Sequence, residues 1–253
     1  MSDDWHACAA LVERGDADRF RAIMAAPAAA RPVLFPIYAL ALEVARAPWI
    51  TQEPVIAEMR LQWWRDALDE IAQGPQVRRH EVTTPLAAVL TKAGAEALDD
   101  LVLARRWDIY KDPFEDEAAF TSYLEHTAGV PLFAACDALG AADRDVCADA
   151  GFASGLARFL QAIPALEAHN RIPLLDGRAE AVGALARQGL SRLARARKGR
   201  RRVAAAPFLN LCDAEMILKQ AAAAPERVKD GALAAPMFKS AARLSLAATT
   251  GRW

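Results

Sequence analysis

The sequence lacks the features of a secreted, zinc-binding or membrane-spanning protein. Its 253 residues include only four cysteines, which are scattered without a CxxC pair, and four histidines that do not cluster with them. We therefore expect reduced, buried thiols, no disulfide framework and no zinc site. The longest apolar run, Pro32 to Leu42, is too short to cross a bilayer. The acidic start MSDDW has neither the basic nor the apolar segment of a signal peptide, so a cytoplasmic protein is expected.

An excess of one charge is also lacking, because 31 Lys and Arg oppose 32 Asp and Glu. The resulting net charge of −1 gives no overall field that would attract nucleic acid or an anionic membrane. One dense basic segment, Arg192 to Arg202, has seven basic residues in eleven and no aromatic residue on which a base could stack. It predicts a peripheral contact with anionic lipid or an acidic partner, or else a solvated helix end that the helix dipole favours. No nucleic-acid partner is expected.

Helix-forming residues dominate what is present. Apolar residues make up 54% of the chain, no segment alternates with period two, and apolar positions recur at spacings of three and four. The sequence therefore predicts a single all-α domain over residues 1–253. Helices are expected near residues 4–14, 16–25, 29–47, 52–73, 84–94, 95–110, 116–138, 142–168, 179–199, 207–223 and 236–249. Pro54 should lie in the first turn of its helix, Gly74-Pro75 should end that helix, and Pro131 should kink the helix over 116–138.

The helix from Glu53 to Gln73 has the clearest pattern. Asp66, Asp69 and Glu70 stand at i, i+3 and i+4, which permits a metal site. The preferred interpretation is a solvated face with an Arg65–Asp69 ion pair. The opposite face should be buried and should include at least one of the two tryptophans; its members are Ile56, Met59, Trp63, Trp64, Leu68 and Ile71.

Three segments carry a family resemblance. They are PIYALALEVARAPW (Pro36 to Trp49), MRLQWWRDALDEI (Met59 to Ile71) and GFASGLARFLQAIPALE (Gly151 to Glu167). Their order and spacing resemble the squalene/phytoene synthase family, whose members join two prenyl pyrophosphates head to head. The resemblance runs from about Asp18 to Leu218 and implies an isoprenoid-synthase-like helical bundle. In the segment Ser122 to Gly140, the tyrosine, glycine and small residues that the family places around its cavity match Tyr123, Gly129 and Ala134.

The metal-binding aspartates of this family are missing. Its first motif reads roughly Y-A-x-x-R-x-x-D-D-x-x-D, and its second Q-L-x-N-I-x-R-D-x-x-E-D. The leaving pyrophosphate needs Mg²⁺, which binds through carboxylate oxygens. The sequence offers none at these positions, so we expect no metal, no cofactor and no catalytic residue. The first motif falls on Tyr38, Leu42, Ala45, Arg46 and Trp49, and the second on Gly155, Leu156, Arg158, Phe159, Gln161, Ala162, Ala165 and Leu166.

The altered cleft is expected to be partly refilled by the bulky Trp49 and Phe159. The family's pocket closure resembles HNRIPLLDG, residues 169–177, which contains Arg171. His169 is expected to end a helix rather than act as a base. Arg46, Arg158 and Arg171 could form a metal-free anion site, because a buried guanidinium needs a partner; internal salt bridges, with Glu43 and Glu167 nearest in sequence, are the preferred alternative.

The resemblance points to a non-enzymatic function. Within the family the chain is most similar to the catalytically silent branch related to the mitochondrial complex I assembly factor. That likeness implies an assembly or scaffold factor for respiratory NADH dehydrogenase, with a subunit of that complex as partner, acting peripherally at the inner face of a membrane. Two alternatives stay open: a head-to-head prenyl transferase that uses other residues, and a carrier that binds a lipid or isoprenoid without reacting.

Overall fold

A computed structural model describes residues 5–74 and 76–253, and every regular element in this part of the chain is helical. The predicted start of the first helix at Asp4 lies outside the described residues, as does Pro75. The α-helices are α1 (Trp5–Gly15), α2 (Ala17–Ala25), α3 (Arg31–Arg46), α4 (Pro54–Gln73), α5 (Thr83–Ala87), α6 (Lys92–Ala104), α7 (Glu117–Leu124), α8 (Val130–Ala138), α9 (Arg144–Ala168), α10 (Ala179–Lys198), α11 (Ala214–Ala223), α12 (Glu226–Lys229) and α13 (Met237–Thr250). Short 3-10 segments, η1 (Ala28–Ala30), η2 (Ala47–Trp49), η3 (Arg105–Asp108), η5 (Arg200–Arg202) and η6 (Ala206–Leu211), and one π-helical turn, η4 (Glu125–Gly129), connect them.

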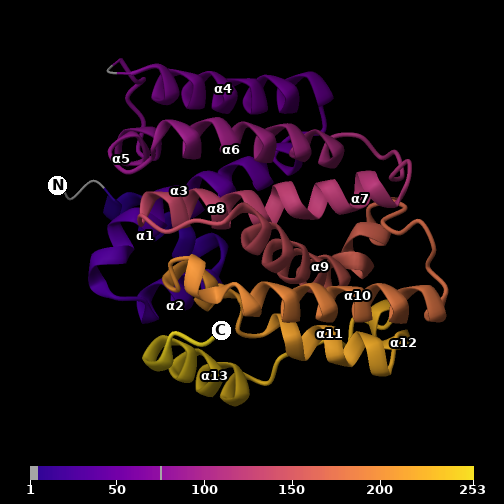
Figure 1. Ribbon diagram of the computed structural model, residues 1–253. Coiled ribbons are helices and arrows are strands. Elements are labelled where there is room, and N and C mark those ends of the chain that lie inside the picture. The colour runs from indigo at the N-terminus through magenta and orange to yellow at the C-terminus, as the bar shows by residue number, and fades with distance from the viewer. Residues whose placement is uncertain (1–4, 75) are drawn as a thin grey trace.

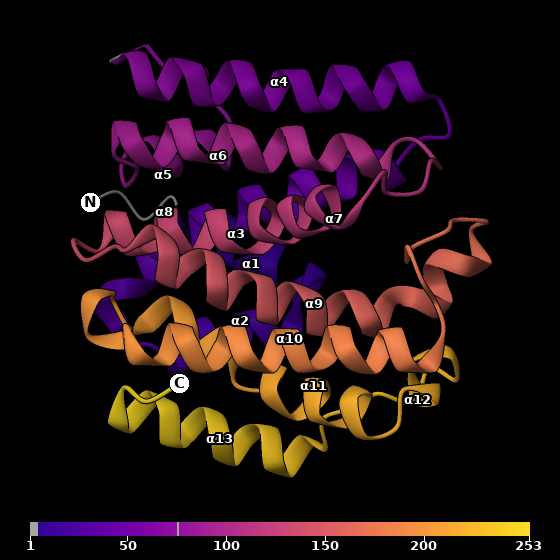
Figure 2. The same cartoon turned by 45° about the vertical axis from the view of Figure 1, so that its right-hand side comes forward.

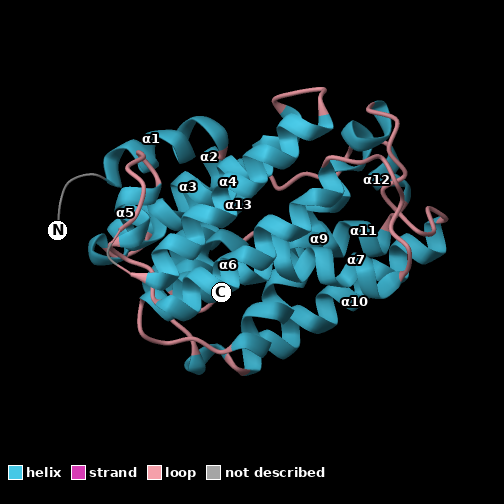
Figure 3. Ribbon diagram, turned by 90° about the horizontal axis from the view of Figure 1, so that it is seen from above, coloured by secondary structure: helices cyan, strands magenta, loops and turns pink. Residues whose placement is uncertain are grey.

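The helices are stacked in layers (Figures 1 and 2). α4 is outermost at one side, α6 lies beneath it, and α3 and α8 follow. α9 packs between the π-turn η4 and α10, and α11 with α13 forms the outermost layer on the other side. The view from above shows helices throughout, joined by loops gathered at the ends of the bundle (Figure 3). This arrangement is the predicted all-α domain.

Helix α3 lies in the core. The stretch Ala28–Trp49 is the one segment of the described residues that is long and apolar enough to cross a membrane, but 56% of its apolar window is buried in the structure. Its buried side chains pack against α1, α8 and α5. We therefore read α3 as the central helix of one half of the core, with α9 central to the other half.

A close helix approach explains two of the small residues. A Cβ atom added to Gly151 of α9 would lie 2.2 Å from the Cα atom of Gly129, so neither position tolerates a larger side chain without movement of the backbone. Gly129 ends the π-helical turn just before Pro131. This turn is the local form of the kink that the proline predicted, since proline cannot donate the N–H of a regular helix.

Some predicted boundaries were wrong for local reasons. The helices predicted over 84–94 and 95–110 are α5 and α6, because the hydroxyl of Thr91 accepts the Gly94 N–H at 2.9 Å and caps a new helix at Lys92. The short helix α12 was missed. On α4, the residues facing the core are Ala57, Leu61, Trp64, Ala67 and Leu68, while Ile56 and Met59, predicted to be buried, are exposed.

Candidate functional site

The first degenerate motif occupies the C-terminal half of α3 and the turn η2. Tyr38 is 2% exposed, and its hydroxyl has no hydrogen-bond partner within the described part of the chain. Burial raises the pKa of Tyr38, so the phenol stays neutral. Leu42, at the position of the family's arginine, lies against Gly15 so closely that a Cβ there would be 2.3 Å from a Leu42 methyl carbon. An apolar contact thus replaces a charged one on this face of α3.

The second motif lies on α9, where aromatic rings pack around Phe159. Phe159 is buried, with its ring centroid 5.2 Å from that of Phe120 and 6.0 Å from that of Tyr123. Trp107 and Phe114 complete the same cluster. Phe159 therefore fills space at this point, as the sequence predicted. The Tyr123 hydroxyl donates to buried Asp108 at 3.0 Å, whereas the indole N–H of Trp107 has no partner among the described residues.

Trp49 does not fill the cleft. It is 43% exposed, and its ring packs edge-on against His169 with centroids 5.6 Å apart. The guanidinium carbon of Arg171 lies 4.9 Å from the centroid of the Trp49 indole ring. His169 caps the end of α9, which confirms its predicted role as a helix-end residue. The expectation of refilling thus holds for Phe159 and fails for Trp49, because η2 turns the tryptophan outward at the mouth.

Arg158 belongs to a polar cluster that links three elements. Its guanidinium donates to Asp16 Oδ2 at 2.7 Å and to Asn210 Oδ1 at 3.0 Å. Asp16 also accepts Arg19 Nε at 2.9 Å, and the Arg19 guanidinium carbon lies 4.6 Å from the centroid of the Tyr38 ring. We call these four residues, Asp16, Arg19, Arg158 and Asn210, the Asp16 cluster.

The Asp16 cluster holds its carboxylate ionised. Burial alone would raise the pKa of Asp16, but the charges of Arg19 and Arg158 outweigh it and lower the pKa to about 2. Burial, and the neighbouring Arg158, lower the pKa of Arg19. One carboxylate therefore serves two arginines. The second-motif residues Arg158, Gln161 and Ala162 line a wide, open depression of about 570 Å³ beside it.

The three arginines of the predicted anion site have separate partners. Arg46 reaches Glu43 at 3.5 Å, and Arg171, only 7% exposed, donates to the carbonyl oxygens of Trp107 at 3.3 Å, Tyr110 at 2.7 Å and Asp108. The internal salt bridges that the sequence analysis preferred are present for Arg46 and Arg158, although Asp16 replaces Glu167 as the partner of Arg158.

The donor chemistry at the two motifs does not fit Mg²⁺. Ala45, Ala162, Ala165 and Leu166 provide no oxygen ligand. The two carboxylates that line the depression beside the second motif are paired with arginines, Asp16 with Arg19 and Arg158, and Asp18 with Arg21. Within residues 5–74 and 76–253, no three His, Cys, Asp or Glu side chains gather in a metal-binding arrangement. No step through a metal follows from this set of residues.

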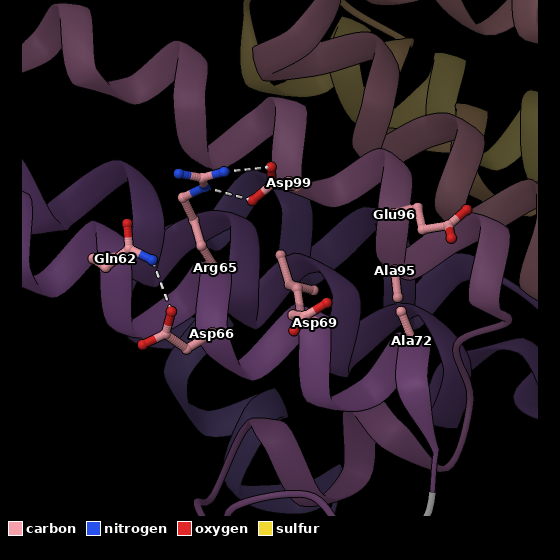
Figure 4. Close-up of a pocket in the computed structure, with 9 residues that line it drawn as sticks. Gln62, Arg65, Asp66, Asp69, Ala72, Ala95, Glu96 and Asp99 are labelled. Carbon is pink, nitrogen blue, oxygen red and sulfur yellow. Dashed lines mark hydrogen bonds and ion pairs between the residues drawn. The ribbon is translucent and has the colours of Figure 1, made fainter.

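Asp66 and Asp69 of α4 line a groove of about 360 Å³ between α4 and α6 (Figure 4), while Glu70 lies outside it and pairs with Arg78 at 2.6 Å. Arg65 pairs with Asp99 of α6 through bonds of 2.7 and 3.0 Å, so the predicted Arg65–Asp69 pair was wrong. The spacing favoured Asp69, but the packed neighbour helix offers both carboxylate oxygens at once. Gln62 and Gln73 donate to Asp66 and Asp69. The metal-site alternative for these residues has no support.

Most of the basic run is also paired within the chain. Arg192 binds Glu125 at 2.5 Å and Asp149 at 2.8 Å, Arg195 binds Asp149, and Arg202 binds Asp143 at 2.6 Å. Arg197 binds Glu215 at 2.8 Å. Lys198, Arg200 and Arg201 have no carboxylate partner within the described residues and are exposed. The peripheral lipid contact of this run stays a prediction.

Exposed apolar side chains gather at the mouth of the altered cleft. Turn η2 contacts both α4 and η3, and Arg171 joins the Trp49 ring to the Tyr110 carbonyl, which brings four segments together. Met59 is 67% exposed here. We call the exposed apolar side chains of these four segments the mouth patch. They are eight of the twelve large hydrophobic residues that are exposed in the described chain: Trp49, Ile50, Val55, Ile56, Met59, Tyr110, Ile172 and Leu175.

Sequence reasoning missed the two features that distinguish this site. Asp16 carried the signal of a helix N-cap, which it is, since it accepts the Arg19 N–H at 3.0 Å. Its pairing with Arg158 spans 142 positions and left no local pattern. Ile56 and Met59 were read as core because a helical period shows which residues share a face and not what covers that face.

Comparisons with known proteins agree with this fold. The sequence profile of the squalene/phytoene synthase family matches residues 12–246. A crystal structure of a dehydrosqualene synthase in complex with ligand superposes with a TM-score of 0.77 at 14% identity, over 97% of this chain and 95% of that one. The squalene synthase HpnC from Alicyclobacillus acidocaldarius gives a TM-score of 0.72 at 16% identity, over 86% and 92% of the two chains. At these identities the two structures establish the fold alone.

A curated relative has a different kind of name. The chain is similar to the "NADH dehydrogenase (ubiquinone) complex I, assembly factor 6 homolog" of Drosophila melanogaster, with 29% identity over 168 residues. The match covers 62% of this chain and 50% of that protein, so the chain spans about half the length of this curated relative.

Proposed function

This chain belongs to the squalene/phytoene synthase family, and we propose that it is a non-enzymatic member that acts as an assembly or scaffold factor for respiratory NADH dehydrogenase (complex I). The partner is a protein subunit of that complex, and the place of action is the cytoplasmic surface of the membrane that holds it. The name of the fruit-fly relative supports the choice of complex, and the site supports the loss of chemistry.

One observation carries the proposal: the charged groups of the former cleft are used internally, while the mouth patch is left open. The Asp16 carboxylate is occupied by Arg19 and Arg158, and Phe159 is packed among rings, so the second-motif positions offer no free carboxylate for a metal. The mouth patch combines Trp, Tyr and Met side chains and lies beside the exposed Arg106. This composition is typical of the residues that dominate protein–protein binding energy.

The decisive experiment is affinity purification from the native membrane fraction after mild cross-linking. The parent protein should retain one or more NADH dehydrogenase subunits, and Val55→Asp with Met59→Asp should lose them, because both side chains lie in the mouth patch. Met24→Asp is the matched control, since Met24 is exposed on α2 away from the patch. A strain without the protein should contain less assembled NADH dehydrogenase on native gels. Unchanged assembly in that strain would contradict the proposal.

An enzymatic assay separates the catalytic alternative. Purified protein incubated with farnesyl or geranylgeranyl pyrophosphate and Mg²⁺ should release no pyrophosphate above the level of a heat-denatured sample. Turnover that depends on Mg²⁺ would overturn the non-enzymatic proposal and favour a prenyl transferase with other ligands.

A second candidate, a lipid or isoprenoid carrier, rests on a separate groove. About 420 Å³ lies between α2, α9, η6, α11 and α13, and its lining combines polar residues such as Arg158 and Asn210 with apolar residues such as Ile217 and Leu233. This polarity suits an amphiphile with one polar end. Native mass spectrometry of the protein purified without detergent would detect a co-purifying lipid. Its absence, together with a positive affinity purification, would favour the scaffold.

A further inference from the structure

The outward face of α13 is unusual because it is almost uncharged. Phe238, Ala241, Ala242, Ser245, Leu246 and Thr249 are all exposed, and they follow one another on one side of the helix. Phe238 is 84% exposed. A surface helix normally presents charged residues to solvent opposite its buried stripe. α13 instead buries one residue, Ala247, and turns a phenylalanine and a leucine away from the protein.

Positive charge surrounds this face. Residues 231–253 contain Lys239, Arg243 and Arg252 and no acidic residue. Lys239 and Arg252 are exposed and form no ion pair within the described residues. Arg197 donates to the carbonyl oxygen of Trp253 at 2.8 Å, which ties the end of α10 to the segment after α13. Lys198, Arg200 and Arg201, which have no carboxylate partner within the described residues, come directly after Arg197 in the sequence.

Two acidic residues contact α13 directly, Asp213 through the Ser240 hydroxyl, which it accepts at 2.6 Å, and Glu215 through Arg243. Glu215 of α11 is bound by Arg197 at 2.8 Å, Lys219 at 2.6 Å and Arg243 at 3.1 Å, so three cations share one anion. A shallow groove between α11 and α13 is lined by Lys219, Arg227, Lys239 and Arg243 and by no acidic side chain. The segment 226–230 carries two acids and two bases and adds no net charge.

We infer that α13 is a membrane-contact helix that lies on an anionic phospholipid surface. Its outward face would enter the headgroup region with Phe238 and Leu246, while Lys239, Arg252 and the free cations near η5 contact the lipid phosphates. Apolar contact and basic flanks together are the pattern of helices that bind in the plane of a charged membrane. Figure 2 shows α13 in the outermost layer on the side opposite α4, so the membrane and a partner on the mouth patch can be bound at once.

Charge complementarity favours lipid over a second protein as the occupant. On the outward face Phe238 and Leu246 are separated by alanine and serine, Met237 is the other large apolar residue exposed on α13, and no tryptophan or tyrosine joins them. Such a face lacks the clustered aromatic anchors of a protein interface. A fluid layer accommodates isolated side chains, and its phosphates match unpaired Lys and Arg.

The test is flotation of the full chain with vesicles of phosphatidylcholine alone or phosphatidylcholine mixed with phosphatidylglycerol. The parent should float with the anionic vesicles only, and raised salt should weaken the binding. A basic residue at an anionic surface contributes about fivefold, so Lys239→Gln with Arg252→Gln should bind about 25-fold more weakly. Phe238→Ala should lose about tenfold by removing the apolar contact.

The matched control is Arg60→Gln with Lys111→Gln, which removes two exposed, unpaired cations on the mouth-patch side. This variant should float like the parent. Equal binding by Lys239→Gln with Arg252→Gln, or weaker binding by the control, would overturn the assignment to α13. Failure of the parent to bind anionic vesicles would overturn it outright, as would a dimer in sedimentation that Phe238→Ala dissolves, since α13 would then face a second copy. None of these readouts involves NADH dehydrogenase, so the proposed function stands or falls separately.

Discussion

The interior of the former cleft and the mouth patch above it differ in how far their side chains are covered by the rest of the chain. Inside, Arg158 and Arg19 share Asp16, Leu42 covers Gly15, and Phe159 lies among four aromatic rings. At the mouth, Met59 and Trp49 face solvent with little cover. A buried charge or ring is stabilised by a partner within the chain, whereas an exposed apolar surface gains most from a partner outside it. The comparison teaches that this bundle covers its charged and aromatic groups with its own chain in the interior, and leaves apolar side chains exposed at the rim.

Replacing Phe159 should have the largest effect on stability. Phe159→Ala would leave a cavity where the rings of Trp107, Phe114, Phe120 and Tyr123 now meet, and we expect the free energy of unfolding to fall by about 4 kcal/mol. Urea unfolding at neutral pH measures this loss. Phe238→Ala is the control, because that ring is exposed and its removal should change the stability by less than about 0.5 kcal/mol. Similar losses in both variants would show that the interior is not closed by Phe159.

The tryptophan pair tests the same contrast on one helix. Trp64 is buried between α4 and the layer beneath it, so Trp64→Ala should cost about 3 kcal/mol. Trp63 is half-buried under the guanidinium of Arg78, whose central carbon lies 4.9 Å from its ring centroid, and Trp63→Ala should cost about half as much. Thermal unfolding of both variants gives the order. A reversed order would mean that α4 presents the other face to the core.

The all-α fold could be predicted from the sequence, because the spacing of apolar residues along a helix is kept when individual residues are substituted. The three-and-four spacing predicted the helices, and Trp64 lies in the core as expected. The site was harder to predict, since pairing there joins distant segments: Arg65 meets Asp99 and Arg158 meets Asp16. Met59 was predicted to be buried but is exposed. An apolar residue on a helix can pack in the core or bind a partner outside it, and helical periodicity does not distinguish these two environments.

Asp16 provides a test through pH. Its pKa is lowered from 3.8 to about 2 in the folded protein, so it stabilises the fold at pH values above about 4 and loses that contribution as the pH falls toward about 2. Asp16→Asn retains a side-chain oxygen for the helix cap and removes only the charge. We expect this variant to be about 2 kcal/mol less stable than the parent at pH 7.

The difference between parent and Asp16→Asn should shrink as the pH is lowered from 4 and should vanish below about pH 2, where Asp16 is protonated and both proteins carry a neutral group. Urea unfolding across this range measures it. A difference that does not depend on pH would mean that the Asp16 charge is not what holds Arg19 and Arg158.

The smallest effect on stability is expected at the mouth patch. A variant there tests partner binding without disturbing the fold. Val55→Ser with Met59→Ser removes apolar surface that is already exposed, so the free energy of unfolding should change by less than about 0.5 kcal/mol. The same variant should weaken partner binding at least tenfold, because an apolar side chain at the centre of an interface often contributes more than 1 kcal/mol. Urea unfolding should therefore show an almost unchanged stability, while affinity purification should show a loss of partner subunits. If the variant instead unfolds more easily and binds as before, Val55 and Met59 belong to the packing of α4, and the mouth patch resembles the closed interior.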